Sequence, residues 1–310
     1  MEPLFTHAVV GLDQSNASDL IIDALPHLQS LGLKKVTLVT VLSISITGER
    51  TEINTDQFKD QLKEYKKRLE GSGLTVDTEL RAGTYFYPPT EILTSADEKD
   101  ADFVIVGSHG QSMVQEMLLG STATEILQRS PLPVFLINME VGLDGDDDSE
   151  TDKEERTLRV QGSFEHCLDH VLHPTDFSET ANRAFEVVKK LDTEGKIGKV
   201  SLIHVQGHHA IGLKDPASHD ELTRRNREAL EDLRNDLSDH TREDAEIIIT
   251  FGTPGKEIIQ TIEENGVTLA VLGSQGRGMV EEFFIGGVSS QVSRFSNIPV
   301  LLVPAARTEA

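Results

Sequence analysis

Two glycine-rich stretches have residue types and spacing that suit phosphate binding. In the first, residues 104–122, a short apolar run is followed by Gly107 and Gly110 and, after nine further residues, by Gly120 and Ser121. We expect Gly107 and Gly110 to let the backbone leave a buried strand in conformations that a side chain would forbid. Gly120 and Ser121 stand where a helix would begin, and the free N–H groups of a helix N-terminus attract anions. The stretch predicts a phosphate-binding loop, although such turns also occur where a strand only packs against a helix.

The second stretch, residues 271–289, repeats the pattern. Gly273, Gly276 and Gly286 each follow their counterparts by 166 residues, which points to a duplicated unit. The first stretch contains no lysine or arginine. Catalysis of phosphoryl transfer calls for a metal, a positioned base and cationic stabilisation of the developing charge. The composition of the loops therefore favours binding over a dedicated enzyme.

The elements that would position these loops also occur twice. Apolar, β-branched runs alternate with amphipathic segments, which predicts an α/β fold with parallel strands covered on both faces. Ligands of such folds gather at the carboxyl ends of the strands, where Asp13 and the first glycine loop lie. Asp176 occupies the place of Asp13 in the second half. We expect strands at residues 7–13, 36–42, 74–80, 103–106 and 134–137, and helices at 14–31, 55–70, 89–97 and 121–129. Their counterparts are strands at 170–176, 200–205, 246–251, 269–272 and about 300, and helices from 178, at 221–237 and from 254.

A long acidic segment separates the two copies. Residues 140–165 are too long and too charged for an ordinary loop of a compact fold, so we interpret them as a linker between domains at 1–139 and 166–310. The spacing of four acidic residues matches a calcium loop, but a serine replaces its turn glycine and no helix pair flanks it, which disfavours calcium coordination. Those residues are Asp144, Asp146, Asp148 and Glu155.

The composition narrows the class of protein. The chain has 310 residues, a single cysteine and a formal net charge of −23. One cysteine excludes an intrachain disulfide and favours a reducing compartment, and no segment is apolar enough to cross a bilayer, so we expect a soluble, cytoplasmic protein. The net charge argues against nucleic acid or an anionic membrane as a partner. It is compatible with a salty cytoplasm and equally with an ordinary acidic protein.

Four residues at the start of the second half have metal-ligand side chains. His166, Cys167, His170 and His173 are close in sequence, as they would be in some metal sites. If the segment enters a strand, however, His170 and His173 fall on opposite faces. We therefore favour solvated or capping histidines there, and the metal ligands of the protein, if it has any, stay undetermined.

Taken together, these motifs resemble the universal stress protein family in each half of the chain. The shared features are an opening strand that ends in VGLDQSN or HPTDFSE, a G-x2-G-x9-G-[ST] signature, and a final strand introduced by LPVFLI or IPVLLV. The resemblance implies two tandem Rossmann-like domains of the adenine nucleotide alpha hydrolase-like type, each with a five-stranded parallel sheet of order 3-2-1-4-5 flanked by helices. It also implies pairing through the last strands, between the halves as an intrachain pseudo-dimer or between chains as a homodimer.

The resemblance further implies an adenine-nucleotide site in each half. In members that bind ATP, the signature glycines hold the phosphates and ribose, while residues that end strands one and two hold the adenosine. The corresponding residues of the first half are Asp13, Val41, Gly107, Gly110, Gly120, Ser121 and Thr122. Those of the second half are Thr175, Asp176, Val205, Gly273, Gly276, Gly286, Gly287, Val288 and Ser289.

The second signature departs from the family pattern, because Gly287 replaces the serine or threonine and removes one hydroxyl donor. We expect ATP or AMP as the ligand, with Mg²⁺ accompanying ATP, in a stress-response protein that acts as a non-catalytic sensor or regulator. We expect both halves to bind nucleotide, and the prediction is firmer for the first site because its signature is complete. The alternative is that the loops of the second half bind no nucleotide. The alternative functions are a slow ATPase or phosphotransferase, and a docking scaffold that needs no nucleotide. Asp13 and Asp176 could bind magnesium or act as a base, and an ordinary Asx turn explains them equally well.

Overall fold

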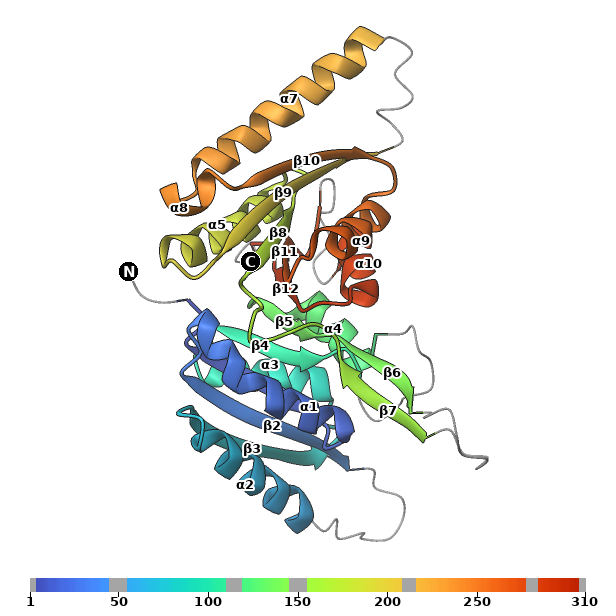
Figure 1. The fold of residues 1–310 in the computed structure, drawn as a ribbon. Coiled ribbons are helices and arrows are strands. Elements are labelled where there is room, and N and C mark those ends of the chain that lie inside the picture. The colour runs from blue at the N-terminus through green and yellow to red at the C-terminus, as the bar shows by residue number, and fades with distance from the viewer. Residues whose placement is uncertain are drawn as a thin grey trace.

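A single ten-stranded β-sheet runs through both halves of the chain, as the computed structural model shows (Figure 1). The structure describes residues 4–44, 55–109, 119–144, 155–207, 216–276 and 284–306. Helices cover both faces of this sheet, so its strands can be apolar on either side. The strand order is β10-β9-β8-β11-β12-β5-β4-β1-β2-β3.

The first half is a five-stranded parallel sheet of order 3-2-1-4-5, as expected. Helices α1 and α2 pack on one face and α3 and α4 on the other, because their buried residues belong to two separate core clusters. The strands are β1 (His7–Leu12), β2 (Lys35–Ile44), β3 (Thr75–Thr84), β4 (Phe103–Gly107) and β5 (Val134–Ile137). The helices are α1 (Asn16–Ala24), α2 (Asp56–Glu70), α3 (Pro88–Glu98) and α4 (Ser121–Arg129).

The second half repeats this arrangement with the same strand order. Its long helix α7 lies against the edge strand β10, while α2 lies against the other edge strand, β3 (Figure 1). The strands are β8 (His170–Pro174), β9 (Lys199–Gln206), β10 (Glu246–Phe251), β11 (Leu269–Gly273) and β12 (Val300–Val303). The helices are α5 (Glu179–Thr193), α7 (Pro216–Asn235), α8 (Asp239–Arg242), α9 (Pro254–Asn265) and α10 (Gly287–Phe295).

The two halves join through their last strands. Strands β5 and β12 pair antiparallel, with Leu136 opposite Val300 and Val134 opposite Leu302. The expected intrachain pairing is therefore present. Each of these strands is also paired with its own half, through β4 and β11. Both backbone edges of β5 and β12 are thus occupied, so homodimer formation through these strands, which the resemblance left open, has no free edge to use.

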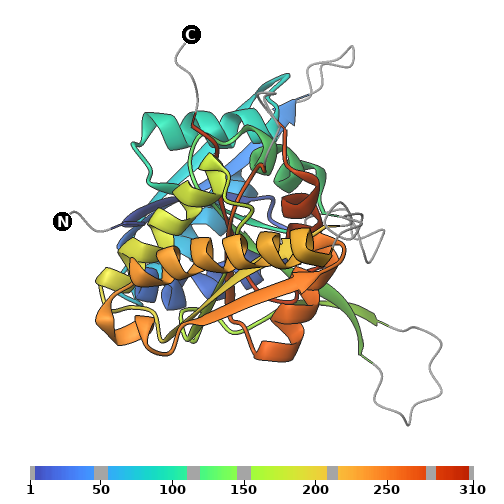
Figure 2. The same ribbon diagram turned by 90° about the horizontal axis from the view of Figure 1, so that it is seen from above.

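The segment expected to be a linker contains a two-stranded antiparallel ribbon. Its strands are β6 (Met139–Asp144) and β7 (Glu155–Val160). In Figure 2 the ribbon extends away from the two halves. At its base Leu158 and Val160 pack against the core that includes α1. Most of the calcium-loop pattern, including Asp146 and Asp148, lies outside the described residues.

The first helix is shorter than the sequence suggests. We expected helix up to Leu31, but α1 ends at Ala24 and the chain continues as a 3₁₀ helix, Leu25–Leu31. Pro26 lies in the first turn of this 3₁₀ helix. Its ring displaces the backbone of a continuing α-helix and it has no N–H to donate, which explains the change. Among the described residues, no helix is both long and apolar enough to cross a membrane.

Candidate functional site

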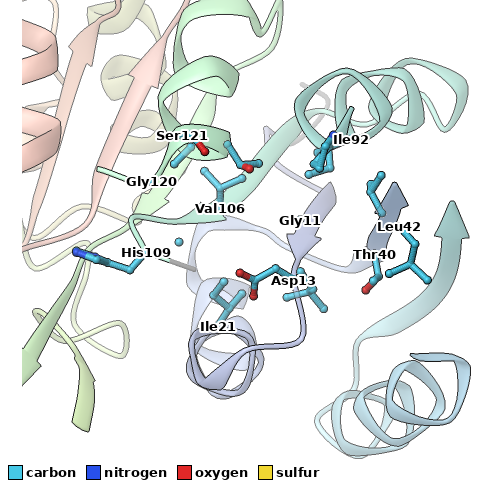
Figure 3. Close-up of a pocket in the computed structure, with 16 residues that line it drawn as sticks. Gly11, Asp13, Ile21, Thr40, Leu42, Ile92, Val106, His109, Gly120 and Ser121 are labelled. Atoms are coloured by element: carbon cyan, nitrogen blue, oxygen red, sulfur yellow. The ribbon is translucent and has the colours of Figure 1, made fainter. Parts of the chain in front are cut away.

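A cavity of about 390 Å³ lies at the carboxyl ends of β1, β2 and β4 in the first half (Figure 3). This volume is within the range of small-molecule sites. Helices α1, α3 and α4 each contribute to the wall. The lining residues include six of the seven positions predicted for the first half: Asp13, Val41, Gly107, Gly120, Ser121 and Thr122. The seventh, Gly110, lies outside the described residues.

A backbone hydrogen bond closes the glycine-rich loop in the same way in both halves. The N–H of Gly120 donates to the carbonyl of Ser108 over 2.8 Å, and the N–H of Gly286 donates to the carbonyl of Ser274 over 2.7 Å. This bond sets the start of α4 and of α10 against the end of the preceding strand. The duplicated signature therefore produces the same loop closure in both halves.

Gly107, the last residue of β4, is required for a different reason than the one we expected. Gly107 does not have a positive φ angle, so its backbone conformation is open to any residue. A Cβ at Gly107 would instead lie 3.0 Å from Met139 Cε and 3.1 Å from Ile21 Cδ1. Similarly, a Cβ at Gly276 would lie 2.7 Å from Asp176 Oδ2. These glycines permit close approach of neighbouring groups rather than an unusual backbone conformation.

Asp13 and Asp176 both form Asx turns at the end of the first strand of their half. Asp13 Oδ1 accepts hydrogen bonds from the backbone N–H of Ser15 over 3.0 Å and from its hydroxyl over 2.6 Å. Asp176 Oδ1 accepts from the N–H of Ser178, also over 3.0 Å. The intervening residue has a φ of 60° in each turn, so the two turns share one geometry. The Asx-turn interpretation is therefore correct, and Asp13 lines the cavity as well.

The N-terminus of α4 faces the cavity without a capping side chain. Its N-cap is Gly120, which has no side chain to accept a hydrogen bond from the first turn. A helix start has backbone N–H groups with no partner inside the helix, and Ser121 and Thr122 belong to that turn and line the cavity. These groups and the helix dipole suit an anion such as a phosphate.

The equivalent helix α10 of the second half begins at Gly287, also without a side-chain cap. Among the described residues, no atom outside the neighbouring backbone lies within 4 Å of the place where a Cβ of Gly287 would be. Ser289 is buried, and its hydroxyl donates to the carbonyl of Gly273 over 2.7 Å. Val288 is exposed. In this half the hydroxyl of Ser289 therefore bonds to the backbone. Gly287, which is equivalent to Ser121, has no hydroxyl.

The remaining positions predicted for the second half lie at the ends of β8 and β9. Thr175 is buried, and its Oγ1 accepts a hydrogen bond from the N–H of Phe177 over 2.9 Å. Its carbonyl accepts a bond from His204 Nδ1 over 2.8 Å. Val205, which follows His204, is half-buried. The predicted positions Thr175, Asp176 and Val205 thus meet at the carboxyl ends of adjacent strands.

Sequence reasoning missed two polar residues of the first cavity, Thr40 and His109. Thr40 lines it, is 1% exposed, and its hydroxyl has no hydrogen-bond partner among the described residues. Alignment of the two halves could have drawn attention to Thr40. Residues 36–41 match residues 200–205, so Thr40 is equivalent to His204.

The charges around the cavity are few. Of its sixteen lining residues, Asp13 is the one carboxylate, and lysine and arginine are absent among them. His109 also lines the cavity, and burial lowers the pKa of its imidazole, which favours the neutral form. Its Nδ1 lies 2.9 Å from Ser108 Oγ. A bound polyphosphate would therefore need a cation to offset its charge beside Asp13.

The histidines at the start of the second half are held by separate partners. His170 Nε2 bonds to Ser201 Oγ over 2.8 Å, while His173 Nδ1 bonds to the carbonyl of Val271 over 2.9 Å. Cys167 is fully buried, and burial raises the pKa of its thiol to about 11. His166 pairs with Asp169 at the surface. No group of three or more potential metal ligands occurs in the part of the chain that the structure describes.

Comparisons with known proteins agree with the duplicated fold. The model of the universal stress protein family matches residues 5–138 and 168–304. A universal stress protein of Methanocaldococcus jannaschii is 32% identical over 152 residues, which are 43% of this chain and 93% of that protein. One from Mycolicibacterium smegmatis is 24% identical over 311 residues, covering 95% of this chain and 96% of its own.

Among solved structures, the crystal structure of a universal stress protein from Archaeoglobus fulgidus covers 97% of this chain and 99% of its own, with 22% identity and a TM-score of 0.68. At this identity the likeness shows the fold alone. The two matches to the family model cover most of the sequence, and each falls on one half of the sheet. The chain therefore belongs to the universal stress protein family, as a tandem member with two copies of the domain.

Proposed function

We propose that the first half of this stress-response protein binds an adenine nucleotide, ATP or AMP, and acts as a non-catalytic sensor. One observation carries the proposal: the cavity joins the uncapped start of α4 to the ends of β1 and β2, and six positions predicted from the family resemblance line it. Phosphates suit the helix N-terminus, and the nucleoside suits the apolar wall that includes Val41 and Leu42.

Magnesium would accompany ATP in this site. Asp13 is the only carboxylate among the described lining residues, and carboxylates are hard oxygen ligands for Mg²⁺; ATP phosphates and water would supply the rest of the coordination shell. The ion would also offset the charge of the phosphates. We propose binding without rapid turnover, because no lysine or arginine among the described lining residues can stabilise charge that develops during phosphoryl transfer.

The second half is proposed as a weaker site of the same kind. Its loop closure and its Asx turn repeat those of the first half. It lacks the hydroxyl at Gly287. A lost hydrogen bond of this kind is worth about 0.5–1.5 kcal/mol, so its affinity for nucleotide is expected to be lower by roughly one order of magnitude at most.

The test is equilibrium dialysis of the full chain with ATP and with AMP, each with and without Mg²⁺. Purified protein is also denatured, and any released nucleotide is identified by mass spectrometry. Gly120→Asp is the diagnostic variant for the first site, and Gly286→Asp is its match in the second. Each glycine has ordinary backbone angles and a nearest contact of 3.4 Å for an added Cβ.

Aspartate is a favourable N-cap residue, so both variants should fold while placing a negative charge where phosphate would bind. We expect Gly120→Asp to remove the tighter binding event and Gly286→Asp to remove the weaker one. Absence of uptake of ATP and AMP by the wild-type chain would overturn the proposal in favour of a docking scaffold. Hydrolysis that is abolished by Gly120→Asp would show an enzyme instead.

A further inference from the structure

The hydroxyl of Thr40 is an unpaired polar group inside the first cavity. Its side chain is 1% exposed, and no described residue accepts from or donates to its Oγ1. Along the sheet its neighbours are Leu12 of β1 and Leu80 of β3, both apolar. Buried hydroxyl groups are normally hydrogen-bonded, and an exception at a cavity wall calls for an explanation.

The residue at the equivalent position of the second half has partners within the protein. There His204 donates from Nδ1 to the carbonyl of Thr175 over 2.8 Å, and its ring lies 4.7 Å from that of Phe177. The imidazole of His204 is thus held against neighbouring groups of its own half. Among the described residues, the hydroxyl of Thr40 has no such partner.

The first half has different side chains at all three of these positions. Thr40 replaces His204, Leu12 replaces Thr175, and Gln14 replaces Phe177. The amide of Gln14 is turned to the carbonyl of Phe58, to which it donates over 3.0 Å. The histidine–phenylalanine pair is thus absent from the first half, and a hydroxyl without a partner lines the cavity instead.

Figure 3 indicates which part of a ligand would meet Thr40. Gly120 and Ser121 lie at one side of the cavity, Thr40 and Leu42 lie at the other, and Asp13 lies between them. A nucleotide with its phosphates at the start of α4 would therefore extend its nucleoside toward β2. This placement of the nucleotide rests on the function proposed for the first half.

We propose that Thr40 is a specificity-determining residue of the first site, whose hydroxyl forms a hydrogen bond with the nucleoside of the bound nucleotide. A hydroxyl can both donate and accept, so it suits a ribose hydroxyl or a polar edge of the base. Because His204 occupies the same position in the second half, the two sites differ in what they recognise at the nucleoside end.

The experiment compares Thr40→Val and Thr40→Ser in the full chain carrying Gly286→Asp, which confines binding to the first site. Valine keeps the shape of threonine and removes the hydroxyl, while serine keeps the hydroxyl. Calorimetric titrations use ATP and inorganic triphosphate, both with Mg²⁺. We expect Thr40→Val to weaken ATP binding about 2- to 12-fold, the worth of one net hydrogen bond. Triphosphate binding should stay unchanged, and Thr40→Ser should retain most of the affinity for ATP.

Thermal unfolding without nucleotide separates recognition from a structural role. An unpaired buried hydroxyl does not stabilise the apo protein, so Thr40→Val should leave its melting temperature unchanged or raise it. The exposed Thr78 of β3 provides the control, because Thr78→Val should alter neither property. Titrations with 2′-deoxy-ATP and with GTP then locate the contact. Thr40→Val should not weaken the binding of the analogue that lacks the group recognised by the hydroxyl.

Three outcomes would overturn the inference. Unchanged ATP affinity in Thr40→Val would show that the hydroxyl does not contact the ligand, while the proposed function would stand. An equal loss of ATP and triphosphate affinity, or a lower apo melting temperature, would show a structural role. No ATP binding by a chain with both sites intact would overturn the proposed function and the role of Thr40 together.

Discussion

Asn138 of the first half donates from Nδ2 to the backbone carbonyl of Ser296 in the second half over 2.9 Å. The same amide nitrogen lies 2.9 Å from the carbonyl of Ile298. Asn138 follows the last strand of its half and is 3% exposed. One buried side chain therefore satisfies two carbonyls across the junction between β5 and β12.

Replacing this asparagine should weaken the junction. Asn138→Ala leaves two carbonyls of the second half without a partner, and we expect it to lower the free energy of unfolding by about 1–3 kcal/mol. Urea denaturation followed by circular dichroism would measure the loss. The equivalent position in the second half is Pro304, whose side chain cannot donate a hydrogen bond. Pro304→Ala should thus have the smaller effect, and an equal effect would contradict the role assigned to Asn138.

Acid should destabilise the protein through its buried histidines. Burial lowers the pKa of His173 to about 4, and it also lowers the pKa values of His7 and His170. In the unfolded chain these groups titrate near pH 6.5. Between about pH 6.5 and 4 the unfolded state binds more protons, so stability is full above this window and falls as the pH drops through it. His173 alone should lower the free energy of unfolding by about 2 kcal/mol between pH 6.5 and pH 5.

The contribution of His173 can be separated from that of the carboxylates. His173→Asn keeps a donor near the carbonyl of Val271, which His173 Nδ1 contacts over 2.9 Å, but asparagine does not titrate. We expect the variant to be less stable at pH 7.5, because it leaves a cavity, and to lose less stability between pH 7.5 and pH 5. Urea unfolding at the two pH values provides the measurement. If the variant lost as much free energy of unfolding between the two pH values as the wild type, His173 would not be a buried neutral histidine.

Gly107 and Gly287 should respond differently to the same substitution. Gly107→Ala introduces a Cβ 3.0 Å from Met139 Cε and 3.3 Å from the carbonyl oxygen of His109, so we expect a loss of about 1–3 kcal/mol. Gly287 lies in the first turn of α10, and the Cβ of Gly287→Ala meets no described atom within 4 Å outside the neighbouring backbone. It should leave stability unchanged or raise it by up to about 1 kcal/mol. Thermal unfolding of both variants tests the contrast, and equal losses would contradict it.

Restoring the family pattern at Gly287 should strengthen the second site. Gly287→Ser supplies the missing hydroxyl at a position with open space around it. We expect a gain in ATP affinity of about 2- to 12-fold at the second site, measured by calorimetry in the Gly120→Asp background. Gly287→Ala is the matched control, since it adds a Cβ without the hydroxyl. If both variants bind ATP equally, the hydroxyl does not contact the nucleotide.

The single cysteine should report on opening of the protein. Cys167 is fully buried, its Sγ lies 3.8 Å from Ser30 Oγ of the first half, and burial raises the pKa of its thiol to about 11. The thiolate is the reactive form. We therefore expect no rapid reaction with a disulfide reagent in native buffer, and one equivalent of reaction in denaturant. Rapid native reaction would show that the contact between Cys167 and the first half opens readily.

The strands could be predicted closely because burial on both faces leaves little choice of residue. Val134–Ile137 is buried throughout and has the bounds expected from its apolar run. The edge strand Glu246–Phe251 is only half-buried, and its β-branched run was sufficient to give its bounds. The family resemblance supplied the strand order, which side-chain periodicity cannot provide. The resemblance also implied the pairing of β5 with β12. This pairing is a long-range contact between the halves, and no local sequence pattern indicates it.

Other features could not be predicted because they depend on contacts made only in the folded chain. Strands β6 and β7 lie in a segment whose acidic composition suggested a linker, although Leu158 and Val160 alternate as strand residues do. The unpaired state of Thr40 was equally hidden, since whether a hydroxyl has a partner depends on which groups the fold places around it. The side-chain environment of Gly107 was hidden for the same reason.

The junction of β5 and β12 within one polypeptide also affects how the two sites can evolve. In a pair of identical subunits every mutation appears twice, so both sites must tolerate it. Here each domain has its own coding sequence within one chain, so threonine stands at position 40 while histidine stands at the equivalent position, 204. Covalent linkage thus lets the two domains differ in sequence while the shared sheet keeps them together.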